Sequence, residues 1–206
     1  MRTDTIETFL AQLAARVPAP GGGATAALHA AQAAALVAMV ARYSDSAKFA
    51  DHAEEIGIIT ATADRLRDNA LGLAEEDAAA FTAVTQAYGL PKGTPDQAAA
   101  RSGAIAKALV GAAQVPAIVI AVADQVLSLT EQLLPIGNRN VISDVAAAAE
   151  GARAAATTAR VNVEINLGGI KDPATWGQLS AVAESVDDLV LRADKVTAAV
   201  RDGLAP

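Results

Sequence analysis

Three glycines followed by an alanine-rich run constrain the fold of this chain most strongly. In GGGATAALHAAQAAALVAMVAR, residues 21–42, the most flexible residues stand directly before a segment of very high helix propensity. Hydrophobic residues make up 52% of the chain and aromatic residues only 3%, so a core must consist mainly of Ala, Leu, Val and Ile. Because small side chains let helices approach one another closely, this composition favours a tightly packed helical protein.

Length and charge limit the class of protein further. The 206 residues fit one domain, which we take to span 1–206, and the absence of cysteine gives no sign of secretion. The N-terminus is acidic where a signal peptide would be basic, and the longest apolar run, Val115–Ala123, is too short to span a bilayer. A net charge of −7, spread along the chain, argues against nucleic acid. We therefore expect a cytoplasmic protein with neither a membrane nor a nucleic-acid partner.

Periodicity and breaks in the sequence predict an all-α, up-and-down bundle of long helices. Asp4 and Glu7 stand at capping-box spacing before a first short helix. Further helices are expected from the glycines to about Tyr43, then over 48–88, from Thr94 or Asp96 onwards, over 140–167, and after Pro173. Pro116 is expected to kink or divide the fourth of these.

Two segments of this pattern allow alternatives. The last helix repeats small and apolar residues at spacings of three and four from Trp176 to Val200, which is a heptad seam that could pack inside the bundle or against a second subunit. The segment RVNVEIN, residues 160–166, alternates like a strand but continues an alanine-rich segment, so we predict helix.

The glycine loop matches no nucleotide-binding motif, because it lacks both the G-x-G-x-x-G pattern and the Lys-Ser/Thr of a P-loop. Gly21, Gly22 and Gly23 nevertheless offer unshielded backbone N–H groups ahead of a helix N-terminus, where an acceptor oxygen or a negative charge is favoured. The alternative is that the glycines only permit a tight turn or a close helix crossing.

Metal chemistry finds no support in the sequence, because the only two histidines, His29 and His52, stand in no ligand pattern. Carboxylates are the remaining acid or base groups. Asp77 follows two glutamates and shares a helix face with Phe81, although a charged triplet of this kind is usually solvated.

A second polar group lies in GNRNVISDVAAAAEGA, residues 137–152. Asn138, Asn140 and Asp144 cluster around a helix start, where side chains can cap the backbone or bind a ligand. Asn162 and Asn166, four residues apart, repeat the theme later on the same predicted helix. Buried amides need hydrogen-bond partners, which a polar ligand would supply.

Six motifs, in order and spacing, resemble the cyclodeaminase/cyclohydrolase family, in the form of a free-standing C-terminal domain of formiminotransferase-cyclodeaminase. The resemblance runs from Phe9 to Asp172, and the motifs are FLAQLAARVPAPGGGATAALHAAQAAALVAMVAR, EEDAAAFTAV, LPKGTPDQ, VPAIV, GNRNVISDVAAAA and NVEINLGGIKD. It implies an all-α fold, a homodimer, a tetrahydrofolate derivative as substrate, and neither a metal nor a permanently bound cofactor.

Two activities go with this resemblance. One is hydrolysis of methenyltetrahydrofolate to 10-formyltetrahydrofolate, and the other is cyclisation of 5-formiminotetrahydrofolate with release of ammonia. We favour the hydrolase for a chain without a transferase domain. A helical binding or assembly module without catalysis is the alternative from a different class.

Both activities act on a positively charged N–C–N carbon, which suggests roles for the candidate residues. We expect Asp77 and Asp144 to flank this carbon, one as a base and the other to orient the substrate. Asn138, Asn140 and Asn166 would position the pterin or the one-carbon group. Other expected contacts are a ring face on Phe81, backbone donors from Gly21, Gly22 and Gly23, and an anionic glutamate tail on Lys92 and Arg101, which could equally be ordinary surface charges.

Overall fold

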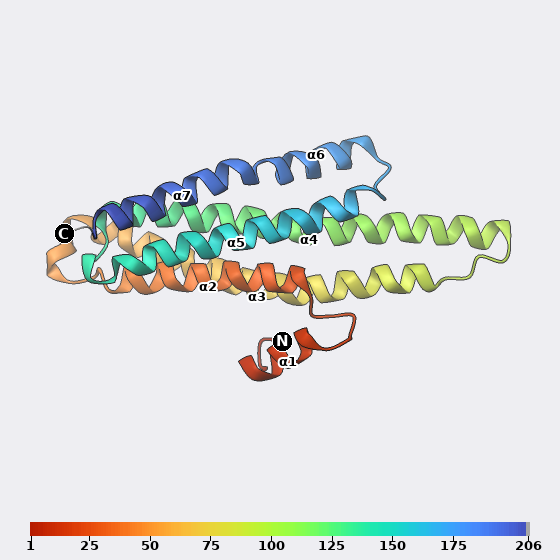
Figure 1. Ribbon diagram of the computed structural model, residues 1–206, viewed down its shortest axis with the longest axis horizontal. Helices are drawn as coiled ribbons and strands as arrows, with labels where there is room; N and C mark the ends of the chain where they lie inside the picture. Colours follow the sequence, from red (N-terminus) through yellow and green to blue (C-terminus); the bar gives the residue numbers. More distant parts are fainter. Residues whose placement is uncertain (205–206) are drawn as a thin grey trace.

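Long antiparallel helices form an elongated bundle in the computed structural model, which describes residues 1–204 (Figure 1). No strand occurs among these residues, so the predicted all-α class is confirmed. The elements in chain order are α1 (Ile6–Ala14), α2 (Gly22–Arg42), η1 (Ala47–His52), α3 (Ala53–Gly89), α4 (Pro95–Ile136), η2 (Arg139–Val141), α5 (Ile142–Leu167), α6 (Pro173–Glu184) and α7 (Val186–Asp202).

Side-chain caps explain where several helices begin. Thr94, one of the two expected starts of α4, accepts a hydrogen bond from the backbone N–H of Gln97 at 3.2 Å, and the Gln97 side chain completes a capping box. The prediction for α1 is wrong by one residue, because Thr5 rather than Asp4 is the cap and accepts from the Thr8 N–H at 3.0 Å.

Two predicted breaks differ from the structure. Pro116 does not divide α4, which is a single helix of 42 residues. The last predicted helix is instead two, since α6 ends at Glu184 and α7 begins at Val186. At this junction the Ser185 hydroxyl donates to the Val182 carbonyl at 2.7 Å, which competes with regular helical bonding.

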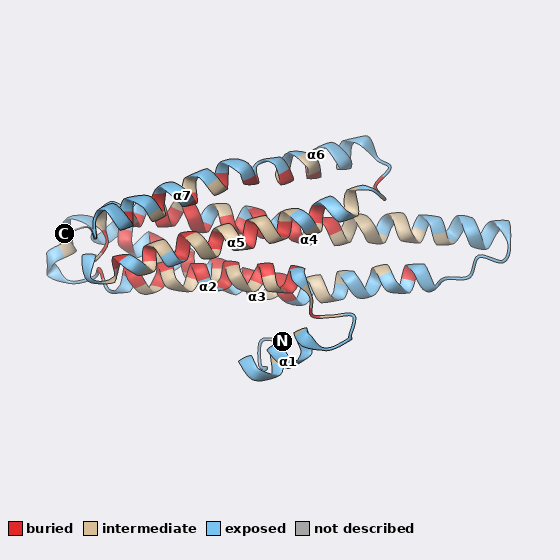
Figure 2. Ribbon diagram, in the orientation of Figure 1, coloured by how far each residue is buried: buried red, intermediate tan, exposed pale blue. Residues whose placement is uncertain are grey.

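Helix α2 forms the centre of the bundle and packs against α3, α4 and α5 (Figure 2). Its buried residues are almost all alanines. A side chain at Gly151 of α5 would come within 3.1 Å of the Ala33 Cβ, so these two helices touch nearly backbone to backbone. The core is therefore built from close approach rather than from large side chains.

The heptad seam of the C-terminal segment packs inside the bundle. Leu179, Ala183, Val186, Ala193 and Val200 are buried, and α7 lies against α5 and α4. This confirms the intramolecular alternative for most of the seam. Trp176 is the exception, because its side chain is 46% exposed.

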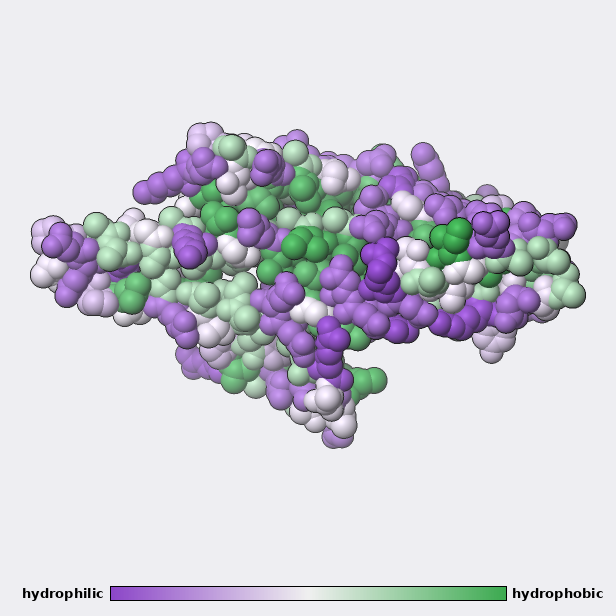
Figure 3. All heavy atoms as spheres, turned by 180° about the vertical axis from the view of Figure 1, so that it is seen from behind, coloured by the Kyte–Doolittle hydropathy of each residue, from purple (hydrophilic) through white to green (hydrophobic). Residues whose placement is uncertain are grey.

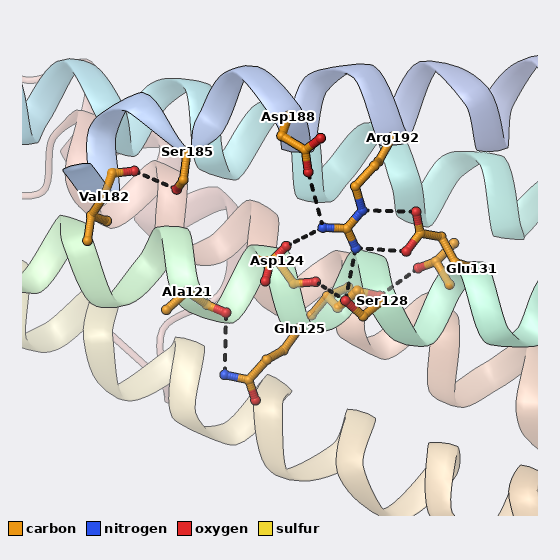
Figure 4. A network of polar contacts seen from close by, with 11 residues as sticks. Ala121, Asp124, Gln125, Ser128, Glu131, Val182, Ser185, Asp188 and Arg192 are labelled. Carbon is orange, nitrogen blue, oxygen red and sulfur yellow. Dashed lines mark hydrogen bonds and ion pairs between the residues drawn. The ribbon is translucent and has the colours of Figure 1, made fainter. Parts of the chain in front are cut away.

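An arginine clamps α7 onto α4 (Figure 4). The Arg192 guanidinium donates to both carboxylate oxygens of Glu131, at 3.0 and 2.7 Å, to Asp124 at 2.5 Å and to the Ser128 hydroxyl at 2.9 Å. Asp188 stands 3.9 Å away. These bonds, to Glu131 above all, raise the pKa of Arg192 well above its usual value, so the charge is permanent.

The C-terminal part of α3 and the N-terminal part of α4 form a hairpin that extends beyond the other helices (Figure 1). Its tip, residues 88–100, is exposed throughout. Helix α1 lies apart from the bundle and buries none of its residues. The start of α2 and the end of α5 thus meet α3 and α4 where this hairpin leaves the bundle.

Two helices, α2 and α4, have the length and composition to cross a membrane. The expectation that no apolar stretch is long enough is therefore wrong by this measure. In the most apolar 18-residue stretch of α2, 61% is buried inside the bundle, but in the corresponding stretch of α4 only 28% is buried.

Replacing Arg192 by Met tests the clamp. The change leaves three carboxylates close together without their cation, so we expect the free energy of unfolding to fall by about 2 kcal/mol, between the values of exposed and buried ion pairs. Asp188→Asn is the matched control, because this side chain is 76% exposed and makes only the longest ion pair of the clamp, at 3.9 Å. Urea denaturation measures both, and equal losses in the two variants would contradict the clamp.

Candidate active site

A cleft of about 370 Å³ opens at the root of the hairpin, where four helices and the linker before α2 meet. Asp77 is the one ionisable residue among those described residues that line it. The lining residues are Pro18 and Ala19 of the linker, Gly21–Gly23 at the start of α2, Asp77, Ala80, Phe81 and Val84 of α3, Leu109 and Ala112 of α4, and Asn162, Ile165 and Asn166 of α5.

The Asp77 carboxylate lies directly against the backbone of Gly23. A methyl group at Gly23 would stand 2.7 Å from Oδ2 and closer still to Cγ and Oδ1, which real atoms do not tolerate. Only glycine leaves room for this contact between α3 and the first turn of α2. Gly23 therefore permits a close approach of two helices, and the group that it brings close is a carboxylate.

Burial raises the pKa of Asp77 above its ordinary value of 3.8, and a hydrogen bond from the backbone N–H of Ala24 offsets part of this rise. Desolvation disfavours the charged form of a carboxyl, whereas the N–H groups at a helix start favour it. The carboxyl is thus poised to take up a proton more readily than a solvated aspartate. This property suits a general acid or base.

The start of α2 has free backbone donors. Gly21 is the N-cap residue and supplies no side-chain cap, while the nearby Thr25 hydroxyl turns back to donate to the Gly21 carbonyl at 3.0 Å. No described glycine has a positive φ, so a left-handed backbone conformation does not explain the three glycines. The N–H groups of Gly22 and Gly23 lie in the first helical turn, where no intrahelical acceptor exists.

Two asparagines of α5 complete the polar lining. Asn162 donates its Nδ2 to the Thr158 carbonyl, and Asn166 donates its Nδ2 to the Asn162 carbonyl, both at 2.8 Å. We did not select Asn162 from the sequence as a site residue, although its spacing of four from Asn166 was the available signal. A Cβ on Gly22 would meet the Asn162 amide at 3.7 Å, so Asn162 covers the first residue of α2.

Six of the candidate residues lie together in the cleft, namely Gly21, Gly22, Gly23, Asp77, Phe81 and Asn166. Phe81 is 45% exposed and forms part of the rim. The sequence prediction of a shared location is confirmed for these residues, while their roles stay predictions.

The other end of the bundle holds Asp144, Asn138 and Asn140. The hypothesis that Asp77 and Asp144 flank one carbon is therefore wrong within a single chain. Asp144 stands in the first turn of α5, eighteen residues before Asn162, or about 27 Å of helix axis. Asn138 donates its Nδ2 to the Tyr43 carbonyl at 2.8 Å and accepts from the Asn140 N–H at 3.0 Å. It is a cap that joins the α4–α5 connection to the end of α2.

Lys92 and Arg101 lie on the hairpin outside the cleft. Arg101 donates to the Tyr88 carbonyl at 3.0 and 3.3 Å and stacks over the Tyr88 ring, which satisfies the end of α3. Lys92 is exposed in the loop between α3 and α4. Within residues 1–204, no group of three or more His, Asp or Glu side chains is placed to hold a metal ion.

Alanine substitutions at the neighbouring glycines test the contact with Asp77. Gly22→Ala finds ordinary space and should leave stability unchanged or slightly higher, since alanine favours helix. Gly23→Ala should lower the free energy of unfolding by about 2 kcal/mol through overlap with the carboxylate. The double variant Gly23→Ala with Asp77→Ala should recover most of that loss in urea denaturation, and additive effects would show that the two residues do not touch.

Comparisons with known proteins identify a family for this chain. A family model described as formiminotransferase-cyclodeaminase matches residues 5–185. The methenyltetrahydrofolate cyclohydrolase of Methylorubrum extorquens is 40% identical over 172 residues, which are 83% of each chain. The mouse formimidoyltransferase-cyclodeaminase is 32% identical over 82% of this chain, which spans only 31% of that longer protein.

A solved structure is also similar along nearly the whole chain. The crystal structure of formiminotetrahydrofolate cyclodeaminase from Thermotoga maritima has a TM-score of 0.85 and 29% sequence identity, and the match covers 97% of this chain and 98% of that one. The family model and the Methylorubrum relative together show that this chain belongs to the formiminotransferase-cyclodeaminase family.

Proposed function

We propose that this protein hydrolyses 5,10-methenyltetrahydrofolate to 10-formyltetrahydrofolate, with Asp77 as the acid–base group. The observation that carries the proposal is the Asp77 carboxyl, which burial disposes to accept a proton inside a cleft with no other ionisable lining residue. The similarity over 83% of both chains to a protein named methenyltetrahydrofolate cyclohydrolase supports the choice of substrate.

The proposed reaction needs one group that first accepts and then returns a proton. The ionised Asp77 takes a proton from water as the water oxygen bonds to the cationic carbon between N5 and N10. The protonated Asp77 then gives its proton to N5 as the N5–carbon bond breaks. The hydroxyl proton of the water adduct is released to solvent at the same time, which leaves the formyl group on N10 and frees one proton overall. A carboxyl with a raised pKa returns a proton more easily than an ordinary aspartate.

The surroundings of Asp77 fit this chemistry. While it is ionised, the carboxylate stabilises the positive charge of the substrate, and the free N–H groups of Gly22 and Gly23 can donate to an oxygen that becomes negative. The half-exposed Phe81 ring offers a flat apolar surface at the rim. No lining residue supplies a cation, so an anionic tail would extend out of the cleft.

Cyclodeamination of 5-formiminotetrahydrofolate is the second candidate. It is favoured by the Thermotoga maritima structure, which matches over 97% of this chain. In this reaction N10 attacks the formimino carbon. The Asp77 carboxyl would then protonate the formimino nitrogen, which leaves as ammonia. A binding module without catalysis is the third candidate, and it predicts that neither substrate is consumed.

Separate replacements of Asp77 and Asp144 by Asn test the assignment. We expect Asp77→Asn to lower kcat by about 10²- to 10⁴-fold, since it removes the acid–base group. Asp144→Asn should stay within a few-fold of the unaltered protein, because Asp144 lies at the far end of α5. The ultraviolet band of the methenyl compound follows the reaction directly, and near-normal turnover by a folded Asp77→Asn variant would refute the role.

We also propose that the protein is a homodimer that buries the apolar surface of α4. Only 28% of the most apolar stretch of α4 is covered within one chain, and hydrophobic side chains gather near the middle of the rear face (Figure 3). A patch of this kind usually marks an interaction site. Sedimentation velocity should give twice the mass of the chain, and a monomer at micromolar concentration would contradict the proposal.

A further inference from the structure

Asn162 and Asn166 turn their amide oxygens away from the helix that carries them. In each residue Nδ2 is held at 2.8 Å from a main-chain carbonyl four residues earlier. Because a carbonyl can only accept, the nitrogen must face the helix, and Oδ1 must face away from it. Neither Oδ1 atom accepts a hydrogen bond from a residue within 1–204, and since no buried polar side-chain atom there lacks a partner, both oxygens are open to solvent.

The polar side chains of the cleft thus present hydrogen-bond acceptors. Both asparagines and Asp77 line the same cleft, where the backbone N–H groups at the start of α2 are the facing donors. The Asn162 amide lies between the Thr158 carbonyl and Gly22. A Cβ added to Gly22 would stand 4.0 Å from the Asn162 Oδ1 atom. A ligand group that lies against both asparagine oxygens must therefore offer hydrogen-bond donors.

The spacing of the two asparagines fits one particular group. Side chains one helical turn apart have their Cβ atoms about 5–6 Å apart. A planar amino group that donates both hydrogens at about 2.9 Å, with an angle of 120° between them, places its two acceptors about 5 Å apart. An exocyclic amino group on an aromatic ring therefore matches the pair.

We propose that Asn162 is a specificity-determining residue that, with Asn166, binds the exocyclic 2-amino group of the substrate's pterin ring. This assignment rests on the proposed function, since it takes a reduced folate as the ligand. It fixes the orientation of the ring, with the amino group against α5 and the one-carbon bridge towards Asp77 on α3.

A pair of ligands that differ only in this amino group tests the assignment. The probes are 5-formyltetrahydrofolate and its 2-desamino-2-methyl analogue, with dissociation constants measured by titration calorimetry. The unaltered protein should bind the amino compound at least tenfold more tightly, because the analogue leaves acceptors unpaired. Asn162→Leu should weaken binding of the amino compound about tenfold and reduce the preference over the analogue to near unity.

Gln125→Leu is the matched control. Gln125 also donates its amide nitrogen to a main-chain carbonyl four residues earlier, that of Ala121, but it lies on the exposed side of α4, outside the cleft (Figure 4). This variant should keep the full preference for the amino compound. Asn162→Ala removes the acceptor oxygen without adding bulk and should also lose the preference, which covers the case in which the leucine variant does not fold.

The possible failures are distinguishable. If the unaltered protein binds neither compound, the proposed function fails. If it binds the amino compound tightly but Asn162→Leu or Asn162→Ala discriminates as well as the unaltered protein, the role of Asn162 is refuted while the function stands.

Discussion

The contact between the Asp77 carboxylate and Gly23 determines how the cleft is built. It requires that one residue of α2 has no side chain, and it sets a carboxyl of α3 against the backbone donors of the first turn of α2. The carboxyl loses much of its water there, which raises its pKa, yet the neighbouring N–H groups keep ionisation within reach. The glycines therefore let the Asp77 carboxyl come close to the backbone of α2, and the alanine-rich helix holds that backbone rigid.

The same close packing explains the rest of the bundle. The buried residues along α2 are mostly alanines, and Gly151 of α5 meets Ala33 almost backbone to backbone. Small side chains bury little surface each, so ion pairs such as Arg192 with Glu131 fix the register of the outer helix α7. The tip of the hairpin of α3 and α4 has no such cover among residues 1–204 and is exposed.

Much of the fold could be predicted from the sequence, because breaks and caps are local signals. Thr94 and Pro95 mark the start of α4, and the seam of α7 is visible as a spacing of three and four. The break at Ser185 was not predicted, because serine hydroxyls also donate to main-chain carbonyls inside helices that continue unbroken, as Ser185 does to Val182. Of the two expected effects of Pro116, division of the helix does not occur, since α4 continues through it.

The site was only half predictable, because local motifs do not tell which ends of long helices meet. Asp77, Gly22 and Asn166 could be selected as polar or flexible residues in apolar segments. Asp144 and Asn138 gave the same signal, yet α5 carries Asp144 about 27 Å from the cleft. Asn138 looked like a ligand residue because a helix cap and a binding site use the same donors and acceptors.

The protonation of Asp77 is the property on which this account depends most directly. Carbon-detected NMR can follow the Asp77 carboxyl carbon across pH, with Asp77→Asn to assign the signal. We expect its midpoint to lie clearly above 3.8, and Gly22→Ala to leave it unchanged. A midpoint at or below 3.8 would mean that the carboxyl is neither desolvated nor poised for proton transfer, and would contradict the account.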